Sequence, residues 1–466
     1  MLFSSPTFVL FFCAYLLLHV LLPPRLRLAL IIVGSTIFYG YWNPYYVWLP
    51  FALMLIAYWG AIMVSDASSA EDRKCKAAVV IVALLLPLLA VKYTNFIYQD
   101  VIGLVAGQRE QLLDWKLPLG ISFITFTLIA YVVEVYSGRY RVEKSVGMLM
   151  GLVLFFPHLI AGPILRPAEL LPQLHRPKRR LGVRTIFGIA IFSVGLIKKL
   201  VFADPLAEVV DLIFRADASG FSMLEYLLGI YAFSAQIYCD FSGYTDMAIG
   251  TAIMLGVKLP KNFQRPYVSE SLVEFWARWH ITLSKWLRDY LYIPLGGNRQ
   301  GLRRQLLNLN ITMALGGLWH GASWNFVVWG VAHGLGISFV HAVRELKVLR
   351  WLGTLPRSLK IFVTFHFVTL CWIPFRSPDL VTTWRVIAGP IVAPLGDVNA
   401  FLSEYAFPLA LIGVFLFTHR WDEYRNIRSF VQKTPRALLW PVLAAIWILA
   451  VAVSSGSSAK FIYFDF

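Results

Sequence analysis

The sequence predicts an all-α, polytopic integral membrane protein, built as a bundle of about ten to twelve membrane helices with additional re-entrant and interfacial helices. Of the 466 residues, 58% are hydrophobic and only 15% are charged, whereas soluble domains carry about 25% charged residues. The apolar residues form long runs, close to the roughly 20 residues that a membrane helix needs. Such runs argue against a membrane β-barrel, whose strands alternate in polarity over about ten residues. No repeat or long linker divides the chain, so residues 1–466 are predicted to form one domain.

The net charge of +16 is explained by membrane topology rather than by nucleic-acid binding. Lys and Arg accumulate in cytoplasmic loops, where they face the anionic lipids of that leaflet. Basic clusters occupy residues 25–27, 73–76, 139–144, 176–184, 288–304, 344–360 and 420–436. These clusters are predicted to be cytoplasmic, whereas the stretches 96–116, 204–224 and 377–402 are predicted to lie outside, as are both chain termini. Membrane lipids are therefore expected partners, and nucleic acid is not.

The apolar runs lie near residues 7–22, 28–42, 45–64, 77–95, 117–136, 147–165, 185–203, 225–250, 306–322, 324–343, 360–376, 403–418 and 437–455. The first run is expected to be a retained helix, because no basic residues precede it and no small-residue cleavage motif follows it. Basic clusters flank residues 147–165 on both sides, so this run is predicted to dip into the membrane and return. Basic clusters also flank residues 306–343, which are predicted to form a helical hairpin.

Residues 271–292 carry the pattern of an amphipathic helix. Apolar residues recur there at three- and four-residue intervals on one face. The Trp, Lys and Arg residues of this segment suit an interfacial helix on the cytoplasmic side. His280 falls on the apolar face and is expected to point into the protein. By itself it fits a packed, hydrogen-bonded core histidine as well as a functional one.

His320 lies inside the apolar, glycine-rich stretch Leu315–Trp324. An ionisable side chain within a bilayer costs roughly 2.5 kcal/mol or more unless it faces the protein interior or water. An imidazole, with its pKa near 6.5, is suited to accept a proton from a hydroxyl group at neutral pH. Trp319 and Trp324 are expected to line a narrow pocket around it. The alternative is a structural hydrogen bond to a neighbouring helix.

Asp240, Ser242, Tyr244 and Asp246 form a polar insert in another apolar run. Aspartates are too costly to face lipid, so the insert is expected to point inward. There it could orient a histidine or bind substrate, or it could form a hydrogen-bond network that fixes helix packing. The metalloprotease, nucleophile-elbow and P-loop patterns do not occur in the sequence, so no metal site is predicted.

The chain ends in an aromatic tail, residues 461–466, in which Tyr463 carries a nucleophilic hydroxyl group. Tyr and Phe settle at the level of the lipid headgroups. Taken by itself, the tail therefore favours an interfacial anchor.

The core region, residues 238–341, resembles the membrane-bound O-acyltransferase (MBOAT) family, and within it the bacterial alginate O-acetyltransferase membrane-subunit branch. The motifs that carry this resemblance are Tyr238–Gly250, Asn262–Tyr267, Glu274–His280, Trp286–Asn298 and Gly316–Gly321, with Pro118–Phe123 and Ile160–Ile164 extending it toward the N-terminus. It implies the MBOAT fold, a ring of helices around a thin centre whose site is reached from both faces. It also implies that His320 is the catalytic histidine and His280 the second histidine.

The same resemblance implies the reaction and its partners. An acetyl group would come from acetyl-CoA in the cytoplasm, with no bound cofactor, and would cross the bacterial inner membrane. A periplasmic SGNH-type protein would then pass it to an exopolysaccharide. The tail is similar to the F-I/V-Y-F-x-F tails of this branch, whose tyrosine, here Tyr463, is the proposed acyl carrier. Asp465 departs from that pattern, in which a Gln is expected.

The predicted site therefore has three catalytic residues, His320, His280 and Tyr463, and a group that binds or orients substrate, namely Asp240, Ser242, Tyr244, Asp246, Trp319, Trp324, Asn262 and Arg288. Arg288 belongs to a basic face that could attract the phosphates of coenzyme A, although the charge bias of cytoplasmic loops explains it equally well. Two alternatives remain open. One is transfer of a D-alanyl or fatty acyl group, and the other is a proton-coupled transporter with the histidines as a relay.

Overall fold

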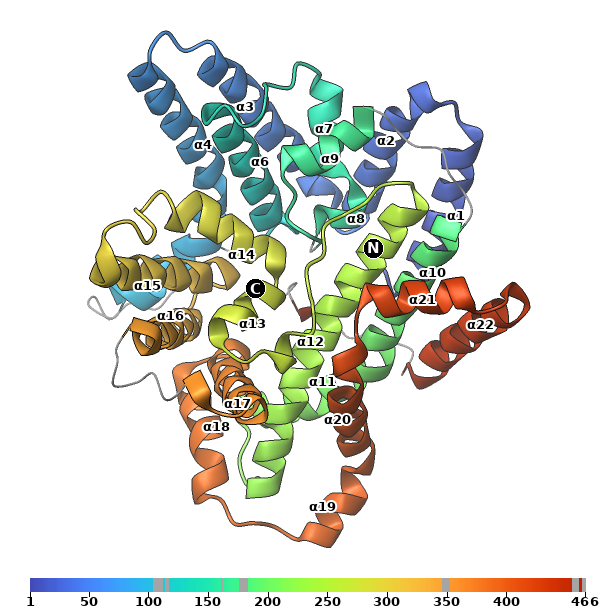
Figure 1. Cartoon of the computed structure of the whole chain (residues 1–466), viewed down its shortest axis with the longest axis vertical. Helices are drawn as coiled ribbons and strands as arrows, with labels where there is room; N and C mark the ends of the chain where they lie inside the picture. The colour runs from blue at the N-terminus through green and yellow to red at the C-terminus, as the bar shows by residue number, and fades with distance from the viewer. Residues whose placement is uncertain are drawn as a thin grey trace. The chain divides into compact units, whose positions relative to one another are not determined.

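The computed structural model describes residues 1–103, 112–113, 117–160, 162–175, 183–345, 353–454 and 461–462. Within these ranges every regular element is a helix (Figure 1), which confirms the all-α prediction. Six helical stretches among the described residues are long and apolar enough to cross a membrane, or up to seven if the bent pair Val398–Glu404 and Ala406–Trp421 is one span. The chain is thus a multi-pass membrane protein.

The expected ten to twelve membrane helices exceed this number because several apolar runs form shorter helices. Pro6–Leu21, Ile121–Tyr136 and Leu380–Val392 have 10–17 residues each. At 1.5 Å per residue, a helix of 16 residues extends about 24 Å, less than the roughly 30 Å of a hydrocarbon core.

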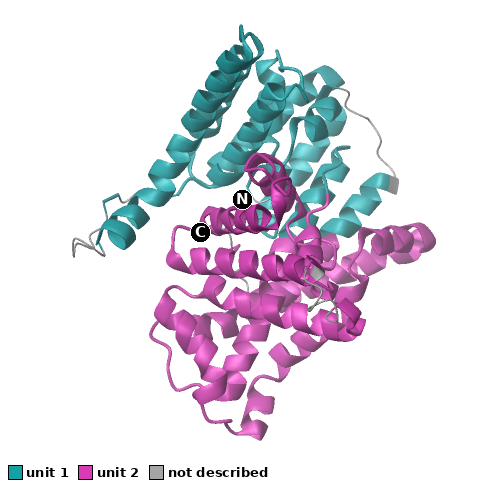
Figure 2. Cartoon of the chain, turned by 60° about the vertical axis from the view of Figure 1, so that its left-hand side comes forward, with its two compact units in different colours: residues 1–192, 244–260 teal, residues 193–243, 261–466 magenta. Residues whose placement is uncertain are grey.

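The helices form two compact units that are interleaved in the sequence (Figure 2). Unit 1 contains Met1–Phe192 and Tyr244–Pro260, and unit 2 contains Ser193–Gly243 and Lys261–Phe466. Two helices, α10 (Val183–Ile197) and α12 (Met223–Met254), each contribute residues to both units.

Unit 1 contains α1 (Pro6–Leu21), α2 (Arg27–Gly40), α3 (Trp48–Ser65), α4 (Ala70–Phe96), α6 (Ile121–Tyr136), α7 (Val146–Leu154), α8 (Phe156–Leu159) and α9 (Pro167–His175). Helices α3, α4 and α6 pack against one another. The run at residues 147–165 is broken, as the flanking charges predict. Its longest helix, α7, has nine residues and extends only about 14 Å.

Unit 2 contains α11 (Asp204–Phe214), α13 (Leu272–Arg278), α14 (Ile281–Leu287), α15 (Gly301–His320), α16 (Trp324–Glu345), α17 (Arg357–Arg376), α18 (Leu380–Val392), α19 (Val398–Glu404), α20 (Ala406–Thr418), α21 (Tyr424–Lys433) and α22 (Arg436–Val453). The π-helical segment η4 (Lys198–Ala203) joins α10 to α11. The stretches 204–224 and 377–402, expected to be loops, therefore contain helices.

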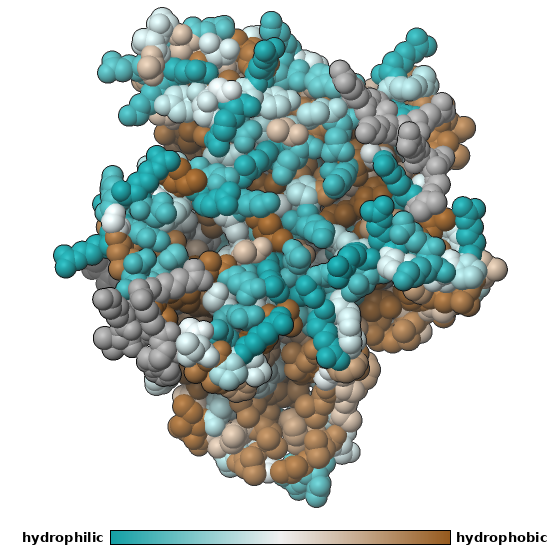
Figure 3. Space-filling model, viewed as in Figure 1, coloured by the Kyte–Doolittle hydropathy of each residue, from teal (hydrophilic) through white to brown (hydrophobic). Residues whose placement is uncertain are grey.

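The outer surface of unit 2 around α18 to α20 is apolar, as the brown area at the bottom of Figure 3 shows. Val381, Ile391 and Phe417 are 80%, 82% and 62% exposed there. A soluble protein rarely exposes so continuous an apolar area. We therefore assign this surface to the lipid-facing side of the unit.

Candidate active site

His320 is the last residue of α15 and lies in a closed aromatic environment within unit 2. The residue is 3% exposed. The ring centroids of Trp319, Trp329 and Phe375 lie 4.9, 5.0 and 5.2 Å from the imidazole centroid. Trp324, the other wall expected from the sequence, is 41% exposed at the start of α16. The aromatic residue of α16 that contacts His320 is Trp329.

Helices α15 and α16 pack side by side, which confirms the predicted hairpin. Two glycines allow the close approach. A Cβ atom on Gly317 would overlap the main-chain carbonyl oxygen of Phe326, and one on Gly330 would overlap that of Met313. The hairpin brings the C-terminal end of α15 against α16, so that His320 and Trp329 meet.

His280 lies at a break between two short helices. The prediction of one continuous amphipathic helix over residues 271–292 is wrong, because α13 ends at Arg278, α14 begins at Ile281 and the π-helical turn η6 covers Arg288–Tyr292. His280 has a φ angle of 41°, in the left-handed region. A non-glycine residue pays about 1–3 kcal/mol for such a conformation, and strain of this kind is concentrated at functional sites.

Asn262 holds this strained turn in place from a neighbouring loop. Its main-chain carbonyl accepts a hydrogen bond from the Ile281 N–H at 2.9 Å. Its Oδ1 atom accepts from the Thr282 N–H at 3.2 Å and from the Thr282 hydroxyl group at 2.9 Å. Asn262 is fully buried. These contacts give it a positioning role: it fixes the backbone on the C-terminal side of His280.

The two histidines are connected through a single indole ring. The Trp319 centroid lies 6.1 Å from that of His280 and 4.9 Å from that of His320. His280 is fully buried, as expected for a residue pointing inward. Burial lowers the pKa of its imidazole to about 3. The ring is therefore neutral at neutral pH and can act as a hydrogen-bonding group without carrying charge.

Asp240, in α12, is part of a buried ionic network. The Lys199 ammonium group lies 2.8 Å from an Asp240 carboxylate oxygen and 2.8 Å from one of Asp204. Lys199 and Asp240 are both buried. Buried charges persist when they are paired in this way. Lys199 lies in the π-helical segment η4, and Asp204 follows that segment directly, so the two side chains can reach each other.

The C-terminal tail reaches the same network. The main-chain N–H of Ile462 donates to the second carboxylate oxygen of Asp240 at 2.8 Å. Phe461 is fully buried, and its ring centroid lies 6.0 Å from that of Phe241. The Phe241 centroid in turn lies 4.8 Å from that of His280. Phe461 and Ile462 are thus buried in unit 2, unlike an anchor at the membrane surface. Tyr463 lies outside the described residues.

The other predicted polar residues of α12 are Ser242, Tyr244 and Asp246. All three are buried, which confirms that the insert points inward. Ser242 belongs to unit 2 together with the histidines, whereas Tyr244 and Asp246 belong to unit 1. In unit 1 the Tyr244 ring packs on Phe3 with a centroid distance of 4.7 Å.

Arg288 differs from the rest of the predicted set because its side chain is 59% exposed. It pairs with the carboxylate of Asp289 at 2.7 Å. It therefore contributes to a basic surface and is not part of the buried site.

Sequence reasoning missed Lys199, Asp204, Trp329 and Phe375. A signal for Lys199 was available, because Lys198 and Lys199 interrupt the apolar run 185–203. A lysine at membrane depth needs a buried partner, and Asp240 was already identified as a buried aspartate.

The fold and site define a class of protein: a multi-pass helical membrane protein whose interior holds two histidines among aromatic rings. The family model for the membrane-bound O-acyltransferase family matches residues 145–375. The chain is 37% identical over 401 residues to "Probable alginate O-acetylase AlgI" of Azotobacter vinelandii, covering 83% of this chain and 77% of the relative. It is 34% identical over 496 residues to the protein of the same name from Pseudomonas putida, covering both chains fully.

A relative with a different printed acceptor is also similar. The "Peptidoglycan O-acetyltransferase" of Helicobacter pylori is 34% identical over 426 residues, covering 84% of this chain and 80% of the relative. The chain belongs to the membrane-bound O-acyltransferase family and is an acyltransferase.

Proposed function

We propose that this protein O-acetylates a polysaccharide outside the bacterial inner membrane, with acetyl-CoA in the cytoplasm as the acyl donor. The names of the similar proteins support an acetyl group as the group transferred and a polysaccharide as the acceptor, since these names specify O-acetylation of alginate or of peptidoglycan. A periplasmic SGNH-type protein would deliver the acetyl group to the sugar hydroxyl.

The observation that carries the proposal is the position of the tail relative to the histidines. Contacts run from Phe461 to Phe241, from Phe241 to His280, and from His280 through Trp319 to His320. Tyr463 follows Ile462 directly in the chain. The buried contacts of Phe461 and Ile462 within the unit that holds the histidines support the tail as the acyl carrier, with the Tyr463 hydroxyl group as the proposed nucleophile.

In the first step the Tyr463 oxygen attacks the thioester carbonyl carbon, and His320 accepts the phenolic proton. The carbon–sulfur bond then breaks, and the coenzyme A sulfur leaves as a thiol after taking the proton from the imidazolium. General-base assistance of this kind contributes typically about 10²–10⁴-fold in rate. In the second step a hydroxyl group of the SGNH-type protein attacks the tyrosyl acetate, and its proton goes to the departing tyrosine oxygen, which regenerates the tyrosine hydroxyl. A sugar hydroxyl then takes the acetyl group from that protein.

The test is transfer of radiolabelled acetyl groups from acetyl-CoA to the protein in proteoliposomes. The wild-type chain should become labelled, and His320→Ala and Tyr463→Phe should each abolish the label. His366→Ala is the matched control, because His366 contacts Tyr231 and takes no part in the ring contacts described above. Wild-type labelling of the His320 variant would refute the role of His320. A wild-type chain that takes no label from acetyl-CoA would favour a D-alanyl or fatty acyl donor, or a transporter.

A further inference from the structure

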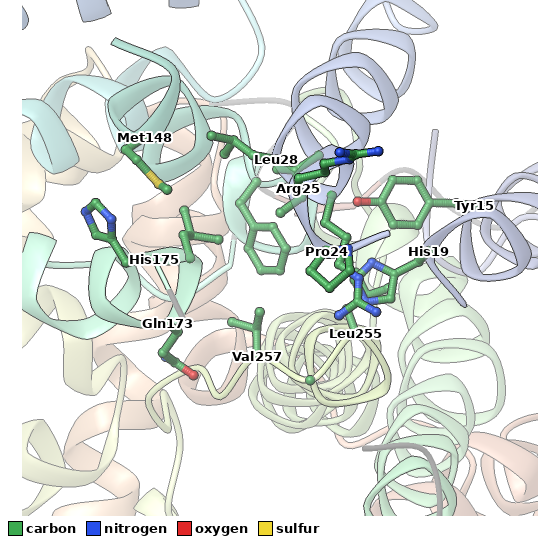
Figure 4. Close-up of a pocket in the computed structure, with 15 residues that line it drawn as sticks. Tyr15, His19, Pro24, Arg25, Leu28, Met148, Gln173, His175, Leu255 and Val257 are labelled. Atoms are coloured by element: carbon green, nitrogen blue, oxygen red, sulfur yellow. The ribbon is translucent and has the colours of Figure 1, made fainter. Parts of the chain in front are cut away.

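A cavity of about 340 Å³ lies within unit 1 (Figure 4). Side chains of α1, η1 (Pro24–Leu26), α2, α7 and α9 line it, together with residues 255–257 that follow α12. The histidines discussed above belong to unit 2. Its volume falls in the range of small-molecule sites, about 300–1,000 Å³.

The charged side chains that line the cavity are two arginines, Arg25 and Arg27. Arg25 is exposed, whereas Arg27 is buried. His19 and His175 also line the cavity, and the Glu143 Oε2 atom lies 2.9 Å from the Nε2 atom of His175. Among the described residues that line the cavity there is no carboxylate. Guanidinium groups bind phosphate with charge-assisted hydrogen bonds, so the lining favours an anionic ligand.

Two buried polar atoms of the lining have no hydrogen-bond partner among the described residues: the Tyr15 hydroxyl oxygen and the His19 Nδ1 atom. Tyr15 is 3% exposed. Figure 4 shows Tyr15, His19 and Arg25 on one side of the cavity, opposite Met148 and His175. A buried polar group without a partner costs about 1–3 kcal/mol. A ligand oxygen between the Tyr15 hydroxyl and the arginines would remove that cost for the phenol.

The rest of the lining is hydrocarbon. Leu28, Ile31, Phe155, Leu174 and Val257 supply apolar surface to the same cavity. A free inorganic anion would leave this surface without a contact. A ligand with both a phosphate group and an apolar part satisfies both sides of the cavity.

We propose that the cavity binds a phosphate-bearing amphiphile, with the phosphate near Arg25, Arg27 and the Tyr15 hydroxyl and the apolar part against the aliphatic side chains. The basic cluster at residues 25–27 is predicted to be cytoplasmic. That side offers two sources of this chemistry, an anionic phospholipid of the inner leaflet and a coenzyme A thioester. The proposal holds whichever acyl group the histidines transfer.

The test measures binding to the full-length protein purified in a neutral detergent, by native mass spectrometry and titration calorimetry. The probes are dioctanoyl phosphatidylglycerol, acetyl-CoA and, as a zwitterionic control, dioctanoyl phosphatidylcholine. One saturable site that the cavity variants weaken is expected for phosphatidylglycerol or for acetyl-CoA. Because acetyl-CoA is also the proposed donor at the histidine site, its binding is assigned to the cavity only if the cavity variants weaken it. The phosphatidylcholine control is expected to bind much more weakly.

Two conservative substitutions in the lining test whether the ligand binds in this cavity. Arg25→Gln alters an exposed side chain, and Tyr15→Phe removes one oxygen atom, so both should fold. We expect Arg25→Gln to weaken binding about tenfold and Tyr15→Phe about fivefold, in line with the loss of one hydrogen bond each. The matched controls Lys74→Gln and Tyr45→Phe, the latter at a residue 84% exposed, should bind like wild type. Absence of saturable binding of both anionic probes, or equal affinity of wild type and the two cavity variants, would overturn the proposal.

Discussion

Asp240→Asn should release the C-terminal tail while leaving the fold intact. The asparagine has nearly the same shape as the aspartate but only one accepting oxygen. Lys199 lies 2.8 Å from one carboxylate oxygen, and the Ile462 N–H donates to the other at 2.8 Å. If the amide oxygen faces the ammonium group of Lys199, the amide N–H₂ group faces the Ile462 N–H. Two donors then oppose each other, and the tail loses its hydrogen bond.

The size of the effect follows from the type of bond. A hydrogen bond to a charged acceptor contributes roughly 1.5–3 kcal/mol. Since about 1.4 kcal/mol is a factor of ten in an equilibrium, the undocked fraction of the tail should rise about 10- to 150-fold. Lys199 keeps Asp204 as a partner at 2.8 Å, so its charge is still compensated and the ion network should survive.

Cysteine labelling measures this opening directly. Ile462→Cys, in a background with the exposed Cys13 and Cys75 replaced by serine, places a thiol at a position that is 8% exposed. Its reaction rate with a maleimide then reports the undocked fraction, and Asp240→Asn should raise that rate at least tenfold. Glu225→Gln is the matched control, since Glu225 is also in α12 but bonds to Ser222. Equal labelling rates with and without the Asp240→Asn substitution would refute the idea that this carboxylate holds the tail.

Two further predictions concern the elements that carry the histidines. Gly317→Ala should lower the free energy of unfolding by about 1–3 kcal/mol through overpacking, which a lower thermal midpoint would show. Gly413→Ala is the control, because a Cβ atom there meets nothing within 4 Å, and it should leave the midpoint unchanged. Equal midpoints for the two variants would contradict the close contact of α15 and α16. The His280 pKa of about 3 lies below the ordinary 6.5, so the unfolded chain binds the proton first as the pH falls. Stability should then be complete above about pH 6.5 and fall by about 2 kcal/mol by pH 5. His280→Gln should flatten that decline in thermal-shift profiles, and parallel profiles would show that His280 does not cause it.

The sequence predicted the features that depend on local composition. The long apolar runs indicated an all-α membrane protein, and the basic residues on both sides of residues 306–343 indicated the α15–α16 hairpin. The break at His280 was not predictable in this way. The apolar residues before and after it keep the spacing of one helix, and the backbone turn depends on Asn262, which lies outside the amphipathic segment.

Long-range contacts account for what the residues alone left undecided. The bond between Asp240 and Ile462 joins positions 222 residues apart, and no periodicity links them. The aromatic residues around His320 could not be predicted from the sequence for the same reason. Trp324 and Trp329 are both in α16, and only the packing of that helix against α15 selects Trp329 as the residue next to His320.

The ionic network and the histidine site belong to one physical arrangement. A buried Lys–Asp pair contributes little net stability, because the loss of hydration offsets the attraction, so Lys199 requires another explanation. Asp240 lies between the two groups: one carboxylate oxygen is 2.8 Å from the Lys199 ammonium group, and the other accepts from the Ile462 N–H. The next residue of α12, Phe241, contacts both Phe461 and His280. We therefore expect a substitution at Asp240 to affect both the tail and the surroundings of His280.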